Sequence, residues 1–249
     1  PEIVARFLQE ARTASMLHHE HIVDITDFGY TKQGLAFLTM EYLEGEDLAT
    51  LLAREGRQPW TRVRRMILQV CRALDAAQEK GIVHRDMKPD NCFRIKRGGN
   101  HDFIKILDFG IAKVIVDGQN PNRADRPKMA TEAGTLLGTP EYMAPEIARD
   151  QKADARVDVY SLGIVMYELL TGHRPFRAGA LAKLLHAIVY ATPAPMLSLR
   201  PELPAELENV VAMAMHKEPE KRYPNGAEFA NAIARVHAQL RKGADRGDR

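Results

Sequence analysis

Apolar residues recur at helical spacing at the start of the chain and then give way to two short apolar runs. The opening positions share one helical face and predict an amphipathic helix; they are Ile3, Phe7, Leu8, Ala11, Ala14 and Leu17. Residues 22–28 and 35–41 form apolar-rich runs on either side of a Tyr-Thr-Lys-Gln-Gly segment. Runs of this kind flanking a turn that contains glycine predict two antiparallel strands.

A second long helix is predicted over residues 59–80, where apolar positions again follow a helical period. Pro59 suits the first turn of a helix and Gly81 suits its end, and one apolar face contains Val63, Met66, Ile67, Val70 and Leu74. Two short strands are predicted at residues 93–95 and 103–107, around a polar Arg-Gly-Gly-Asn turn.

The second half of the chain is predicted to be mainly helical. Residues 157–170 are almost continuously apolar and predict a buried helix, and residues 181–190, 205–216 and 226–240 are further helical segments. Between the two halves, residues 116–135 are rich in polar residues, glycine and proline, which predicts a long and functional loop. Residues 241–249 are predicted to be a charged tail or the start of a linker.

Composition narrows the class of protein. The 249 residues are 45% hydrophobic and 27% charged, as in an ordinary globular protein. The net charge of +2 gives no reason to expect a nucleic-acid partner or a membrane surface. The apolar runs are too short to span a bilayer and no signal peptide is seen. Cys71 and Cys92 have no metal-binding spacing and are expected to be reduced thiols, so we expect a cytoplasmic protein.

Three motifs occur in order along the chain. They are His84-Arg85-Asp86-Met87-Lys88-Pro89-Asp90-Asn91, then Asp108-Phe109-Gly110, then Gly138-Thr139-Pro140-Glu141-Tyr142-Met143-Ala144-Pro145-Glu146. They resemble the catalytic loop, the metal-binding turn and the substrate-docking loop of protein kinases, and the likeness extends over essentially the whole chain. The sequence Asp-Phe-Gly-Ile-Ala-Lys is similar to that of bacterial, eukaryotic-like serine/threonine kinases.

The resemblance implies an α+β fold of the bilobal, protein kinase-like type. Residues 1–43 would be the remainder of an incomplete small antiparallel β lobe, residues 44–240 the large and mainly helical lobe, and residues 241–249 the tail. The glycine-rich loop and the ATP-contacting lysine of the family would lie upstream of Pro1, so we expect an N-terminally truncated domain. On that expectation, the 249 residues alone should bind ATP weakly and turn over poorly.

The resemblance also assigns the chemistry, which is transfer of the ATP γ-phosphate to a serine or threonine hydroxyl of a protein. Asp86 would accept a hydrogen bond from that hydroxyl and orient it, because an ionised carboxylate only accepts. Lys88 would offset charge on the transferring phosphate. Asn91 and Asp108 supply hard oxygen ligands for Mg²⁺, or alternatively Mn²⁺. The residue type at position 88 favours serine/threonine specificity over tyrosine specificity.

The segment after the second strand resembles the hinge beneath the adenine ring. Met40 would close the back of the pocket, the main chain of Glu41 and Leu43 would face the base, Asp47 would contact the ribose, and Phe93 would form an apolar floor. The alternative is an ordinary strand edge followed by an acidic helix start.

Regulatory roles follow from the same resemblance. Glu10 would pair with the upstream lysine, unless it is simply a solvated helix residue. Arg85 would anchor a phosphate on the long loop through a charge-assisted contact, with Thr131 and Thr135 as the candidate acceptors. Both threonines could instead be ordinary solvated loop residues.

Several further positions are assigned structural roles by the resemblance. Thr139 would bond near the catalytic residues, Asp158 would hold the backbone of the catalytic loop, and Glu146 and Arg222 would form an ion pair under the docking loop. A further stack would tie the first helix to the metal-binding turn, through Ala14, Ile25, His84 and Phe109.

Two alternative interpretations use the same residues. His18, His19 and His21 are close together in the sequence and could hold zinc. The local sequence, however, resembles the turn between the first helix and first strand of a kinase. A pseudokinase that serves as a binding or scaffold module would keep the fold and lose the chemistry. The presence of Asp86, Lys88, Asn91 and Asp108 favours the enzyme.

Overall fold

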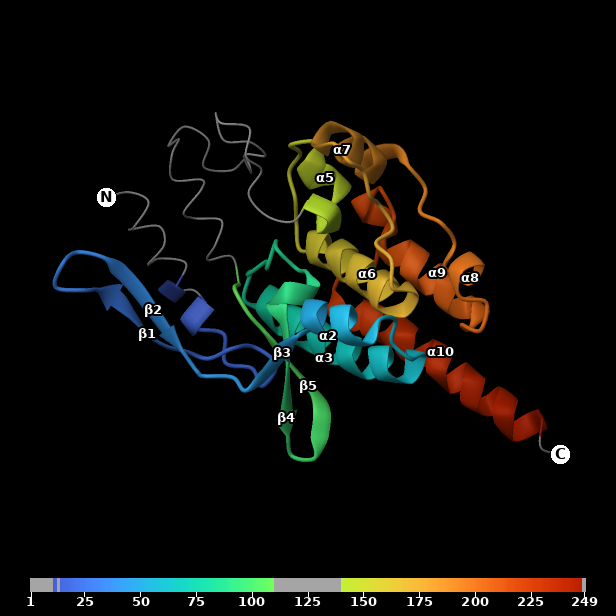
Figure 1. The fold of residues 1–249 in the computed structure, drawn as a ribbon, viewed down its shortest axis with the longest axis horizontal. Coiled ribbons are helices and arrows are strands. Elements are labelled where there is room, and N and C mark those ends of the chain that lie inside the picture. Colours follow the sequence, from blue (N-terminus) through green and yellow to red (C-terminus); the bar gives the residue numbers. More distant parts are fainter. Residues whose placement is uncertain (1–10, 13, 110–139, 248–249) are drawn as a thin grey trace.

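The computed structural model describes residues 11–12, 14–109 and 140–247, and for residues 243–247 it describes the backbone alone. Of two small antiparallel sheets, the two-stranded one lies at the left of Figure 1 and the three-stranded one lies low in the middle, while most helices gather at the right. The predicted order holds in outline: a hairpin comes first and a mainly helical part follows, with two helices before the last two strands. The described part of the opening segment is helical at residues 11–12 and 14–15, where a helix is predicted.

The first sheet is a hairpin of β1 (Ile25–Tyr30) and β2 (Ala36–Met40). The strands pair antiparallel from Ile25 opposite Met40 to Tyr30 opposite Ala36, which confirms the predicted hairpin. Gly34 adopts a φ of 80° in the connecting turn, a conformation that glycine reaches without steric cost. The predicted first strand begins too early, because Ile22 instead forms a parallel bridge with Ile106 of the second sheet.

The second sheet contains β3 (Gly45–Asp47), β4 (Cys92–Arg97) and β5 (Asn100–Ile106) in that order. Gly98 and Gly99 both have positive φ, of 55° and 78°, which is what a tight hairpin turn between β4 and β5 requires. The two predicted strands around this turn are confirmed. β3 is too short to give a periodic signal and was not predicted.

The long helix α3 (Trp60–Glu79) begins after Pro59 and ends before Gly81, whose φ is 72°, as predicted. Its apolar face is buried, and its amphipathic pattern explains why: one stripe packs into the core while the polar stripe stays in solvent. The short helix α2 (Leu48–Glu55) precedes it and was missed, because it has few turns over which a period can be recognised.

The helical part is organised around α6 (Arg156–Thr171), almost all of whose residues are buried. Around it lie α5 (Pro145–Ala148), α7 (Leu181–Tyr190), α8 (Met196–Leu199), α9 (Ala205–Ala214) and α10 (Gly226–Gly247). The helices predicted over 157–170, 181–190 and 205–216 are confirmed. α10 continues beyond the predicted end at residue 240 and projects from the body in Figure 1. The lobe boundaries and the linker stay predictions.

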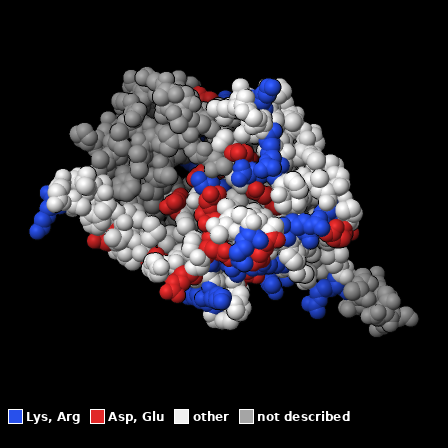
Figure 2. Space-filling view, in the orientation of Figure 1, with Lys and Arg blue, Asp and Glu red and all other residues white. Residues whose placement is uncertain are grey.

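Charged side chains of both signs mix over α2 and β3 on the face shown in Figure 2. Arg62 joins Asp102 at 2.8 Å and Glu55 at 2.5 Å, and Arg94 joins Asp102 at 3.3 Å. This network ties α2, α3 and the second sheet together. Cys71 and Cys92 are free and buried, and none of the helices described here is long and apolar enough to cross a bilayer.

Candidate active site

The catalytic-loop motif lies between α3 and β4 and is held from below by the first turn of α6. The carboxylate of Asp158 accepts the backbone N–H of His84 at 2.7 Å and that of Arg85 at 2.8 Å. Arg85 has a φ of 65°, an unfavourable conformation for a residue with a side chain, which these hydrogen bonds help to maintain. Burial raises the pKa of Asp158, while the His84 ring and both amides act in the opposite direction. The structure therefore brings Asp158 to the predicted position.

His84 is fully buried and has a defined pattern of hydrogen bonds. Its Nδ1 accepts the backbone N–H of Asp86 at 3.2 Å, so its Nε2 carries the proton and donates to the Leu107 carbonyl at 2.8 Å. Its ring also meets the edge of Phe109, with centroids 4.7 Å apart. Both ring nitrogens of His84 thus bond within the protein, and its ring packs against Phe109, its neighbour in the predicted stack.

The side chains of Asp86, Lys88 and Asn91 meet around one carboxylate. Lys88 Nζ lies 3.1 Å from Asp86 Oδ2. The Asn91 amide nitrogen donates to the Asp86 backbone carbonyl at 2.7 Å and to Asp86 Oδ2 at 3.1 Å. Because the Asn91 amide nitrogen donates to both of these oxygens, the orientation of the amide is fixed, and its own oxygen is left for another partner. The predicted catalytic triple is therefore brought together by a 3₁₀ turn over Pro89–Asn91.

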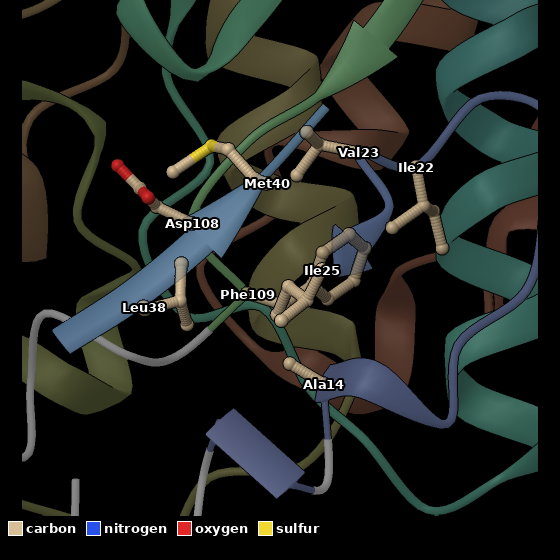
Figure 3. Close-up of a pocket in the computed structure, with 8 residues that line it drawn as sticks. All are labelled: Ala14, Ile22, Val23, Ile25, Leu38, Met40, Asp108 and Phe109. Carbon is tan, nitrogen blue, oxygen red and sulfur yellow. The ribbon is translucent and has the colours of Figure 1, made fainter. Parts of the chain in front are cut away.

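Asp108 follows β5 and faces a small apolar pocket together with Met40 of β2 (Figure 3). Its φ of 54° turns the chain sharply after the strand. Leu107 N donates to the Asn91 carbonyl at 2.9 Å, which holds the two predicted metal ligands on adjacent segments. The rest of the pocket wall comes from Ala14, Ile22, Val23, Ile25, Leu38 and Phe109. Ala14, Ile25 and Phe109 of the predicted stack thus line one pocket, and His84 contacts Phe109.

The remaining predicted nucleotide contacts lie outside the lining of that pocket. Leu43 is half-buried in the segment between β2 and β3. Asp47 pairs with Phe93 across β3 and β4. The Asp47 carboxylate also caps α2, since its Oδ1 accepts Thr50 N at 2.7 Å and its Oδ2 accepts the Thr50 hydroxyl at 3.0 Å. Asp47 is therefore a helix cap, and its predicted ribose contact stays a prediction.

Glu146 and Arg222 form the predicted ion pair under the docking loop. Arg222 Nη1 and Nη2 donate to the two carboxylate oxygens of Glu146 at 2.7 and 2.6 Å. Both side chains are almost completely buried, at 0% exposure for Arg222 and 3% for Glu146. The other N–H groups of Arg222 donate to backbone carbonyls, and its guanidinium lies over the Tyr160 ring at 4.8 Å. The pair is closed to solvent and ligands.

Four predicted residues lie outside the described part of the chain: Glu10, Thr131, Thr135 and Thr139. Arg85, the predicted phosphate anchor, is exposed.

His21, one of the three histidines that could have held zinc, is buried and its Nδ1 donates to the Ile104 carbonyl at 2.9 Å. Burial lowers the pKa of both His19 and His21.

Lys105 was not singled out from the sequence, although it lies next to the site. It is 4% exposed near the end of β5, on the strand that leads to Asp108. Its ammonium donates to Glu41 Oε1 at 2.6 Å and to the Ile22 carbonyl at 3.0 Å. The available signal was a single lysine inside the otherwise apolar run Phe-Ile-Lys-Ile-Leu, since a lysine is rarely buried without a partner.

Comparison with known proteins places the whole chain in one family. Residues 2–233 match the family described as "Protein kinase domain". The chain is similar to "Serine/threonine-protein kinase Pkn1" of Myxococcus xanthus, with 44% identity over 94% of this chain and 32% of the relative. It is also similar to "Tyrosine-protein kinase MasK" of the same species, with 37% identity over 94% of this chain and 36% of the relative. The chain thus spans about a third of the length of each relative.

The fold agrees with this result. The crystal structure of the PknI kinase domain of Mycobacterium tuberculosis superposes with a TM-score of 0.70 at 26% identity, over 93% of this chain and 78% of that one. The predicted α+β kinase fold is confirmed, and so is the resemblance on which it was based. The chain belongs to the protein kinase family, whose enzymes act on proteins with ATP and a divalent metal ion.

Proposed function

We propose that this chain is the catalytic part of a serine/threonine protein kinase, which transfers the γ-phosphate of ATP to protein hydroxyls. The observation that carries the proposal is the convergence of Lys88 and Asn91 on the carboxylate of Asp86, each at 3.1 Å. Phosphoryl transfer needs positioning and charge neutralisation more than covalent chemistry. An oriented carboxylate beside a lysine meets both needs.

Asp86 is proposed as the residue that aims the substrate hydroxyl. Its side chain is 31% exposed, so a hydroxyl can reach it, and its backbone is fixed through His84 and Asp158. An ionised carboxylate accepts the hydrogen bond of the hydroxyl and turns the oxygen toward the phosphate. Lys88, at 17% exposure, offers its ammonium to the phosphate oxygens.

Asn91 and Asp108 are proposed as the metal ligands. The amide nitrogen of Asn91 is occupied by Asp86, which leaves the amide oxygen as a ligand, and Asp108 supplies a carboxylate from the adjacent segment. Mg²⁺ prefers hard oxygen ligands of this kind, and we propose Mg²⁺ with Mn²⁺ as the substitute. When bound, the ion neutralises charge on the phosphates.

For the nucleotide we propose the hinge contacts. Met40 would close the back of the pocket, the main chain of Glu41 and Leu43 would meet the adenine, Asp47 would meet the ribose, and Phe93 would lie beneath the base. The shared pocket of Met40 and Asp108 supports this arrangement (Figure 3). Glu10 is proposed to pair with a lysine that contacts the phosphates.

Regulation is proposed to act through Arg85. A phosphate on Thr131 or Thr135 would add about −1.5 to −2 charges that a guanidinium can bind through paired hydrogen bonds. The exposed position of Arg85 supports this role. Phosphopeptide mass spectrometry after incubation with Mg-ATP should find phosphate on one of these threonines. Full activity of a Thr131→Ala/Thr135→Ala double variant would contradict the proposal.

The substrates are proposed to be proteins rather than nucleic acids, in the cytoplasm where ATP is available. The net charge of +2 gives no large single-sign field, and charges of both signs mix on the face in Figure 2. A filter-binding titration with mixed RNA and DNA at near-physiological salt should show no saturable binding.

The experiment is a transfer assay with γ-labelled ATP, performed on the protein with all residues that its gene encodes. Asp86→Asn and Asp108→Ala should remove transfer to protein, and Glu206→Gln, a carboxylate-to-amide change on an exposed helix face, should leave it intact. A wild-type protein that binds Mg-ATP yet transfers no phosphate would instead favour the pseudokinase.

Tyrosine phosphorylation is a second candidate, because one relative is named a tyrosine-protein kinase. Acid hydrolysis of the labelled product separates phosphoserine, phosphothreonine and phosphotyrosine. The residue type at Lys88 favours label on serine and threonine. Label on tyrosine alone would reverse the assignment while leaving the mechanism unchanged.

A further inference from the structure

A buried lysine, Lys105, joins three segments, two of which contribute residues to the pocket drawn in Figure 3. Lys105 Nζ donates to Glu41 Oε1 at 2.6 Å and to the Ile22 carbonyl at 3.0 Å. Ile22 lines the pocket, and so does Met40, the residue before Glu41 (Figure 3). On its own strand, Lys105 leads within a few residues to Asp108, a third residue of the pocket wall. One ammonium thus contacts two segments whose residues Ile22 and Met40 line the proposed nucleotide pocket.

The two sheets meet at this lysine. Backbone bonds dock the segment before β1 against β5, since Ile106 N donates to the His21 carbonyl at 2.8 Å and Val23 N to the Ile106 carbonyl at 3.0 Å. Glu41, at the end of β2, exchanges bonds with Asp24, whose backbone N–H donates to Glu41 Oε1 at 2.9 Å. Within the described residues, the ion pairs that connect these segments with β5 are those of Lys105.

The charges at this junction favour one geometry. Lys105 has a 5% exposed side chain and Glu41 a 29% exposed one. Burial raises the pKa of Glu41, but the hydrogen bonds from Lys105 and from the Asp24 amide outweigh it and the pKa is lowered. A buried ion pair adds little net stability because desolvation offsets attraction, whereas it penalises arrangements that separate the charges. The pair therefore acts on orientation more than on folding.

We propose that Lys105 is a positioning residue for the nucleotide, and that its bond to Glu41 sets the adenine-facing main chain relative to Asp108. The inference rests on the proposed function, in which Glu41 and Leu43 face the base and Asp108 binds the metal. Loss of the pair frees the end of β2 to shift against β5. We expect this shift to weaken ATP binding, because both residues of the pair belong to segments that border the nucleotide pocket.

The test is a mutant cycle of Lys105→Met, Glu41→Leu and the double variant, in the full gene-encoded protein. Met keeps the length of the lysine stem, and the double variant replaces the pair with apolar side chains. Lys96→Met is the matched control, an exposed lysine on the neighbouring strand β4. The readouts are the Kd for ATP by direct titration, the KM for ATP, the KM for a peptide substrate, and the thermal midpoint.

Each single variant should raise the Kd and the KM for ATP about tenfold, with the peptide KM unchanged within about twofold. The double variant should bind ATP no more weakly than the single variant with the larger Kd, because both changes remove the same interaction. Lys105→Arg should recover most of the ATP affinity, and Lys96→Met should match wild type. If Lys105→Met does not fold, the same measurements on Glu41→Leu and Lys105→Arg test the proposal.

An ATP affinity within about twofold of wild type in the folded single variants would overturn the proposal. So would additive effects in the double variant, or an equal rise in the peptide KM, which would indicate general loosening. Direct titration separates this proposal from the proposed function. A wild-type protein without transfer activity rejects the kinase assignment, whereas the ATP titration still measures what Lys105 does.

Discussion

Two charged groups that α6 helps to hold contrast in how exposed they are to solvent. The pair of Glu146 and Arg222 is sealed, with side-chain exposures of 3% and 0%, whereas Asp86 and Lys88 are 31% and 17% exposed. Every N–H of Arg222 has an acceptor within the protein. Among the described residues, the side-chain bonds to the Asp86 carboxylate come from Lys88 and Asn91, both at Oδ2.

The difference separates structural charges from those proposed to take part in the chemistry. A fully satisfied, buried pair cannot take part in a reaction, because no group on it is left to bind a substrate. A partly exposed carboxylate fixed through its backbone can receive a substrate and still hold its orientation. The same helix supports both: α6 provides Asp158 for the catalytic loop, and its Arg156 carbonyl and Tyr160 ring for Arg222.

The largest effect is expected at the open group. Asp108→Ala should abolish transfer, and Asp86→Asn should lower kcat by roughly 10³-fold or more, because the hydroxyl and the metal lose their positioning. Thermal midpoints should stay close to wild type, since neither residue is in the core. Initial rates and calorimetric melting check this. Near-normal peptide phosphorylation by either variant would reject the mechanism.

Substitutions in the sealed pair of Glu146 and Arg222 should mainly lower stability. Arg222→Met leaves Glu146 buried without a partner and should cost about 3–5 kcal/mol of unfolding free energy. The double variant Glu146→Leu/Arg222→Met should recover much of that loss, since it also removes the uncompensated charge. Denaturant melts measure both. A single variant as stable as wild type would show that the pair is not sealed in solution.

Asp158 links the two groups and should give an intermediate result. Asp158→Ala removes the acceptor of two backbone N–H groups, that of His84, whose bond is buried, and that of Arg85, whose bond is partly buried. The unsatisfied buried amide should cost about 1–3 kcal/mol of unfolding free energy. Because Arg85 would lose support for its positive φ, activity per folded molecule should also fall. Asp75→Ala, a carboxylate that accepts a single, long N–H bond of 3.3 Å, is the matched control. Loss of stability with full specific activity would limit Asp158 to folding.

The smallest effect is expected for an exposed pair. Arg57 and Glu202 lie 3.8 Å apart with side chains more than half exposed, and Arg57→Ala should change the unfolding free energy by no more than about 0.5 kcal/mol. Transfer activity should be unchanged. A loss comparable to that of Arg222→Met would mean that exposure does not separate the two kinds of charge in this protein.

Local patterns predicted most helices and both hairpins because their signals are written within a few residues. Pro59 and Gly81 bound α3, and Gly98 and Gly99 allow the β4–β5 turn through their positive φ. Helix α2 was not assigned a range because it is short, although a helix start at this acidic segment was the alternative to the nucleotide contact of its cap, Asp47. The first strand was misplaced because Ile22 pairs with a distant strand.

The sequence by itself determined the family and the type of most elements, and it supplied the proposed chemical residues, since motif order and apolar period are local properties. Only the tertiary structure decided which charges meet and how exposed they are. Lys105 meets Glu41 across 64 positions and Arg222 meets Glu146 across 76. Such contacts depend on how sheets and helices pack, which no local period encodes. Burial, and with it the separation of sealed from open charges, follows from that packing.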